Sequence, residues 1–126
     1  MKHAFTAAAA GLAAVSLGAC MSMDNPELVQ PGQPVSAIVV ANATDEPVIE
    51  ILIGRCEDRF MGGPDYGFDR LEGRLRPGES RSFPASPGCY NLRALVGGGL
   101  ILGPGERFTT LNVGADQPAV WAIPQR

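Results

Sequence analysis

Apolar and polar residues alternate in short runs along most of the chain after residue 34, as in strands that bury one face. The clearest run is 89–96, where Cys89, Asn91 and Arg93 fall on the polar face. The opposite, buried face of that run is expected to hold Tyr90, Leu92, Ala94 and Val96. In the run 48–55, the same period predicts a buried face made of Ile49, Ile51 and Ile53.

Other short runs expected to form strands are separated by Gly, Pro and Asn, the residues that favour turns. They cover 35–43, 74–76, 80–83, 100–102, 107–113 and 119–123. We expect 35–43 and 48–55 to form a hairpin about the turn at 42–47. No stretch after residue 34 sustains a helical period, and six or seven short strands predict an all-β domain over 35–126. The expected fold is a small antiparallel β-sandwich with an immunoglobulin-like shape.

The first nineteen residues have the pattern of an export signal. Lys2 and His3 give a positive start, and a weakly polar, alanine-rich run covers 4–17. This run is shorter than the roughly 20 apolar residues of a membrane-spanning helix. The pattern therefore predicts a cleaved signal peptide over 1–19.

The sequence Leu17-Gly18-Ala19-Cys20 resembles the lipobox of bacterial lipoproteins. The resemblance implies cleavage before Cys20, a thioether from its thiol to diacylglycerol, and a third acyl chain on the new amine. Two or more acyl chains anchor a protein stably in a membrane. A lipoprotein attached to membrane lipid through Cys20 is therefore expected.

Met21 and Ser22 follow the cysteine, in place of the aspartate that retains lipoproteins in the inner membrane. In a Gram-negative host the resemblance implies the periplasmic face of the outer membrane. Residues 20–34 contain three prolines and no periodicity, so we expect a lipidated N-terminus and a flexible tether there.

Cleavage would remove 19 of the 126 residues, and with them the single lysine and the single histidine of the chain. The remaining 107 residues carry nine arginines against 13 carboxylates, a formal charge of −4. Without imidazole or amine side chains, the common Ser-His, Cys-His and Ser-Lys nucleophiles are excluded. The acidic pI, near 5.0, argues against binding to nucleic acid.

Three cysteines occur, and lipidation of Cys20 would leave Cys56 and Cys89. An oxidising compartment favours a disulfide between them, although two free thiols remain an alternative. Closing a loop of roughly 34 residues would stabilise the fold by about 3.8 kcal/mol. Strand parity places both sulfurs on the polar side, which predicts a clip from the following loop to a strand rather than an inter-sheet bond.

Residues 57–72 form a long segment for which we expect no regular structure, and function is most plausible there. Its aromatic, apolar and basic residues define a candidate partner surface made of Arg59, Phe60, Met61, Tyr66, Phe68 and Arg70. Two alternatives stay open. The aromatic side chains would cap the sandwich while the charges stay solvated, or Asp58, Asp65 and Asp69 would bind calcium.

Residues 36–97 resemble a group of uncharacterised, exported bacterial β-sandwich domains. The resemblance is carried by turn and core residues, among them 67–71 (Gly-Phe-Asp-Arg-Leu), 75–80 (Leu-Arg-Pro-Gly-Glu-Ser) and 88–94 (Gly-Cys-Tyr-Asn-Leu-Arg-Ala). It implies the fold and no activity. The plan of a lipid anchor plus a sandwich is also similar to that of type VI secretion lipoproteins.

These observations favour a non-enzymatic, membrane-anchored envelope lipoprotein that binds another envelope protein or serves as an accessory or structural module in the periplasm. We expect no catalytic residue, cofactor, metal or nucleic-acid partner. The alternative is a small carboxylate- or metal-dependent enzyme, or a ligand carrier.

Overall fold

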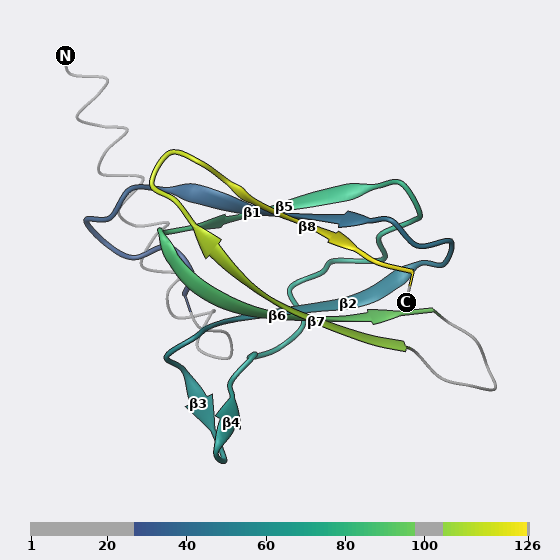
Figure 1. Ribbon diagram of the computed structural model, residues 1–126, viewed down its shortest axis with the longest axis horizontal. Coiled ribbons are helices and arrows are strands. Elements are labelled where there is room, and N and C mark those ends of the chain that lie inside the picture. The colour runs from purple at the N-terminus through teal and green to yellow at the C-terminus, as the bar shows by residue number, and fades with distance from the viewer. Residues whose placement is uncertain (1–26, 98–104, 126) are drawn as a thin grey trace, which may run out of the picture.

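Two three-stranded sheets pack face to face in the computed structural model, which describes residues 27–97 and 105–125 (Figure 1). The first sheet has the order β5-β1-β8, formed by β1 (Ser36–Asn42), β5 (Ser80–Ala85) and β8 (Ala119–Ile123). The second has the order β2-β6-β7, formed by β2 (Val48–Arg55), β6 (Gly88–Val96) and β7 (Gly105–Val113). A separate pair, β3 (Arg59–Phe60) and β4 (Gly63–Pro64), projects from the second sheet. The all-β sandwich is therefore confirmed.

The strand pairing follows the immunoglobulin plan. The antiparallel pairs β1–β5, β2–β6 and β6–β7 correspond to the pairs B–E, C–F and F–G of that plan. Strand β8 lies beside β1, where strand A would lie, but the two run parallel. The other strand pairs are antiparallel, as expected, and this parallel pair is the one departure among the described strands.

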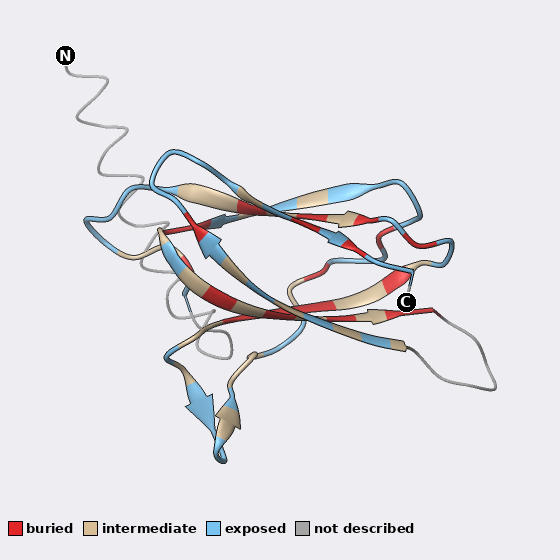
Figure 2. Cartoon of the chain, in the orientation of Figure 1, coloured by how far each residue is buried: buried red, intermediate tan, exposed pale blue. Residues whose placement is uncertain are grey.

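Apolar side chains of both sheets form one core cluster, and Figure 2 shows buried residues on the strands of both sheets. The buried face predicted for β6 is confirmed, since Tyr90, Leu92, Ala94 and Val96 are all buried there. In β2 the prediction holds for Ile51 and Ile53 but is wrong for Ile49. A register shift between Val48 and Glu50 inserts one residue, so that Val48 enters the core instead.

Strands β1 and β2 do not form the expected hairpin, because they belong to opposite sheets. Their connection is held by Asn42, whose Nδ2 donates to the carbonyl oxygens of Glu46 (2.8 Å) and Leu75 (2.9 Å). The Oδ1 of Asn42 accepts from the backbone and the hydroxyl of Thr44. The turn residues at 42–47 thus steer the chain across the core rather than back along the same sheet.

Residues 28–30 lie against the sandwich, although they were expected to be part of a flexible tether. Leu28 is buried in the core, and its carbonyl oxygen accepts from the amide of Ser86 at 2.9 Å. The backbone amide of Gln30 donates to the Ser86 hydroxyl at 2.7 Å. The boundary placed at residue 35 is therefore too late. The signal peptide, Cys20 and the strand expected over 100–102 lie outside the described residues.

Candidate binding surface

The segment 57–72 starts at a disulfide between Cys56 and Cys89, whose Cα atoms are 5.4 Å apart. Cys56 directly follows β2, and Cys89 lies in the neighbouring strand β6 of the same sheet. The Cys56 amide also donates to the Cys89 carbonyl oxygen at 3.0 Å. The predicted disulfide is confirmed as an intra-sheet clip that fixes where the segment leaves the sandwich.

The segment was expected to have no regular structure, but part of it folds into the β3–β4 hairpin. Phe60 pairs with Gly63, and the two residues between them both have positive φ, 53° at Met61 and 85° at Gly62. These values are typical of a type I′ turn, whose twist matches that of the flanking strands. The first turn position is usually Asn, Asp or Gly, and an L-residue with a larger side chain there costs about 1–2 kcal/mol.

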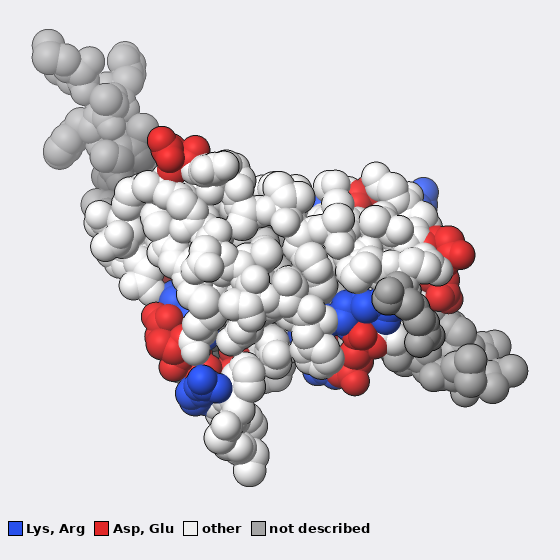
Figure 3. Space-filling view, viewed as in Figure 1, with Lys and Arg blue, Asp and Glu red and all other residues white. Residues whose placement is uncertain are grey.

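The tip of this hairpin presents apolar side chains to solvent. Phe60 is 65% exposed and Met61 is 91% exposed, while Arg59 beside them is also exposed. Figure 3 shows uncharged atoms at the end of the projection and charged atoms nearer the body. Three of the six residues predicted for a partner surface therefore lie together on a prong.

The chain returns from the hairpin by crossing β2 at Gly54. A Cβ atom at Gly54 would lie 1.8 Å from the carbonyl oxygen of Asp65, so only glycine permits this approach. Beyond the crossing, Asp69 Oδ1 accepts from the amides of Ile51 and Leu71, each at 2.9 Å. The Arg70 amide donates to the Ile51 carbonyl oxygen at 2.8 Å. Residues 65–71 thus cover the exposed edge of β2.

Arg70 turns toward the sandwich rather than toward a partner. Its Nε and Nη2 donate to the carbonyl oxygen of Ile53 at 3.1 and 3.0 Å. Burial lowers the pKa of the guanidinium, an effect that nearby Glu27 opposes. Arg70 therefore stabilises the edge of β2 and does not belong to the exposed partner surface that was predicted.

Tyr66 reaches an aromatic residue of the second sheet. Its ring centroid lies 6.2 Å from that of Phe108, which is 58% exposed on β7. The Arg93 guanidinium carbon lies 6.0 Å from the same Phe108 ring, and Arg93 Nε donates to Glu106 Oε2 at 2.6 Å. We call Tyr66, Arg93 and Phe108 the aromatic face. Phe68, two residues after Tyr66, is 61% exposed.

Phe108 and the role of Arg93 were missed by the sequence analysis, which placed Arg93 on the polar face of its strand without a partner. The signal was present, since parity in 107–113 puts Phe108 on the polar face beside Thr110. A large aromatic on a polar face has no core to enter, so it marks a surface worth testing.

The three aspartates considered as calcium ligands instead contact other groups of the same chain. Asp65 Oδ1 accepts from the Gly67 amide at 3.0 Å, and Asp69 holds the β2 edge. Asp58 Oδ2 lies 3.8 Å from Arg55 Nε. Within residues 27–97 and 105–125, no three His, Cys, Asp or Glu side chains are grouped to hold a metal ion.

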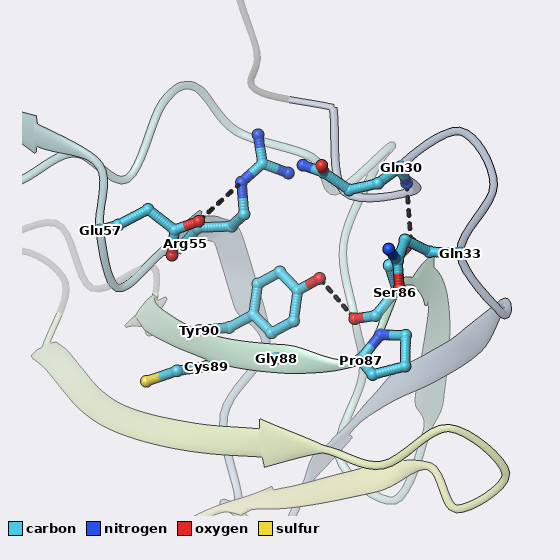
Figure 4. A pocket seen from close by; sticks show the side chains of 9 residues that line it. All are labelled: Gln30, Gln33, Arg55, Glu57, Ser86, Pro87, Gly88, Cys89 and Tyr90. Atoms are coloured by element: carbon cyan, nitrogen blue, oxygen red, sulfur yellow. Dashed lines mark hydrogen bonds and ion pairs between the residues drawn. The ribbon is translucent and has the colours of Figure 1, made fainter.

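A polar pocket of about 260 Å³ lies beside the disulfide, and its lining includes Gln30, Arg55 and Tyr90 (Figure 4). Tyr90 stands in its wall and donates from its hydroxyl to the Ser86 carbonyl oxygen at 2.6 Å, with the Leu28 carbonyl oxygen at 3.2 Å. This contact to the backbone upstream of β6 resembles the tyrosine corner of immunoglobulin sandwiches. Burial raises the pKa of Tyr90. Ser86 and Tyr90 thus hold Leu28 and Gln30 on the sandwich through hydrogen bonds.

Comparisons with protein-family models, curated proteins and solved structures find no match to this chain. Across the described part of the chain, no helix has the length and apolar character needed to cross a membrane. The aromatic face and the hairpin tip are accordingly interpreted from their own chemistry.

Proposed function

We propose that this protein is a lipid-anchored envelope protein that acts by binding rather than by catalysis. Its anchor is Cys20, and its place is the periplasmic face of the outer membrane in a Gram-negative host. The resemblance of residues 17–20 to a lipobox supports the anchor. The Cys56–Cys89 disulfide supports export, because such bonds persist in oxidising compartments.

The aromatic face is the observation that carries the binding role. Phe108 stays 58% exposed although a tyrosine ring and an arginine are held beside it, and aromatic and arginine side chains are enriched where proteins meet. The sequence beyond residue 3 contains no histidine or lysine for general acid–base or nucleophilic chemistry. We therefore propose that this face binds another envelope protein, with the sandwich as an accessory module.

Site-specific photo-crosslinking in cells tests the proposal. A photoreactive residue in place of Phe108 should give one discrete crosslinked protein in the membrane fraction. The matched control is Val120, which is 63% exposed on β8 of the opposite sheet and should give none. Equal products from both positions, or none from position 108, would contradict a partner at the aromatic face. A stoichiometric metal or small molecule in the purified protein would instead favour an enzyme or ligand carrier.

A further inference from the structure

Among the residues that the structure describes, the exposed apolar tip of the β3–β4 hairpin is a second prominent surface, separate from the aromatic face. Phe60 and Met61 lie on the projecting hairpin, which contributes no residue to the core. The stretch 60–64 contains no charged residue. The type I′ turn would be more stable with Asn at position 61. An exposed methionine is thus kept where the backbone disfavours it, which points to a use for its side chain.

The hairpin and the N-terminal entry of the chain leave the molecule at the same end. Arg55, the last residue of β2, donates from Nη1 to the carbonyl oxygen of Glu27, the first described residue. The same guanidinium lies 3.7 Å from Glu57 Oε2 and 3.8 Å from Asp58 Oδ2, directly before the hairpin. One arginine therefore joins the start of the described chain to the base of the hairpin, and Figure 4 shows its ion pair with Glu57.

Chain length places a membrane within reach of the tip. Because Arg55 holds Glu27 on the sandwich, a lipid-bearing Cys20 would be separated from the domain by seven residue steps, at most about 25 Å. The six steps from Arg55 to Met61 span at most about 22 Å. With so short a tether, the bilayer surface is the first large apolar phase that the prong meets.

We propose that the tip formed by Arg59, Phe60 and Met61 inserts into the bilayer interface and orients the anchored sandwich on it. The apolar side chains enter the boundary between headgroups and acyl chains, and Arg59 lies at the level of the lipid phosphates. This contact rests on the proposed lipid anchor. It turns the aromatic face in a fixed direction relative to the membrane, so that a partner meets it in one orientation.

Fluorescence quenching by brominated lipids tests the contact. The acylated protein is extracted from membranes and reconstituted into vesicles of phosphatidylethanolamine and phosphatidylglycerol with brominated acyl chains. The variants are F60W and, as a matched control on the opposite sheet, V120W. The native Trp121 is buried and supplies the background from the unsubstituted protein. The indole in F60W should lose most of its added emission and shift to the blue, whereas that in V120W should do neither.

A second variant and a flotation step separate the possible failures. Adding M61N to F60W keeps the turn but removes the apolar side chain, so quenching should decrease. Protein that does not float with the vesicles would overturn the lipid anchor and the contact together. Protein that floats but shows equal quenching for F60W and V120W, or none, would overturn the contact alone. A protein crosslinked in cells from position 60, with no quenching, would assign the tip to a protein interface and also overturn the contact.

Discussion

At the scale of single residues, Gly54 decides whether the segment 57–72 can return across the sheet. The Asp65 carbonyl oxygen occupies the place of a side chain at this position. We predict that G54A lowers the free energy of unfolding by about 1–3 kcal/mol, the usual cost of forcing extra atoms into a packed site. Urea unfolding measures this. The control is G63A, where a Cβ would meet nothing closer than the Phe60 carbonyl oxygen at 3.9 Å. Equal losses in both variants would contradict the close approach.

Tyr90 should make the fold sensitive to alkaline pH. Burial raises its pKa above the usual value of about 10, because the buried hydroxyl is more stable neutral than ionised. Its contribution to stability is therefore complete below about pH 10 and is lost as the pH rises through the folded-state pKa. At neutral pH the free energy of unfolding of Y90F should be lower by about 1 kcal/mol, because a hydrogen bond is missing. Its free energy of unfolding should also decrease less than that of the unsubstituted protein as the pH rises. Urea unfolding near pH 8 and pH 11 checks this, and parallel declines for both proteins would exclude Tyr90 as the cause.

At the scale of elements, the β3–β4 hairpin carries a turn residue that stability alone would not select. We predict that M61N strengthens the hairpin, because Asn adopts positive φ at lower cost than Met. The amide of Asp65, which donates to the Asp58 carbonyl oxygen at the hairpin's base, reports the effect. Its hydrogen exchange should slow by about two- to fivefold, as expected for 0.5–1 kcal/mol. Unchanged or faster exchange would show that Met61 imposes no strain.

Strand content was largely predictable from the sequence, whereas strand partners were not. Alternation identified the buried face of β6 because every second residue of 90–96 is apolar. The same signal cannot distinguish two strands that pair edge to edge from two that face each other across the core, since both arrangements bury one face. For that reason β1 and β2 were expected to form a hairpin. The hydrogen bond from Asn42 Nδ2 to the Leu75 carbonyl oxygen joins residues 33 positions apart and leaves no local pattern.

The candidate surface was predicted in part. An unusually long connection rich in aromatic residues indicated 57–72, and Phe60, Met61 and Tyr66 are exposed or near the surface. The role of Arg70 could not be predicted, because a guanidinium that donates to the Ile53 carbonyl oxygen is indistinguishable in sequence from a solvated one. Phe108 was missed because it lies 42 residues from Tyr66 and meets it only through the sheet.

At the scale of the whole molecule, one covalent bond closes the base of the segment on the sandwich. Reduction of Cys56–Cys89, or the variant C56S/C89S, should lower the free energy of unfolding by about 2–5 kcal/mol. Urea unfolding with and without dithiothreitol measures the loss, and the reductant should not affect the double variant. If the reductant leaves the unsubstituted protein unchanged, the disulfide makes no contribution to stability.

In the proposed function a lipid anchor at Cys20 would set both the place and the orientation of the molecule, so the decisive measurement is the N-terminal peptide of protein extracted from membranes. Mass spectrometry should find a chain that begins at Cys20 and carries diacylglycerol on the thiol and a further acyl group on the amine. A C20A variant should lack both the cleavage and the lipid. A chain that retains residues 1–19, or an unmodified cysteine at position 20, would contradict the anchored protein proposed above.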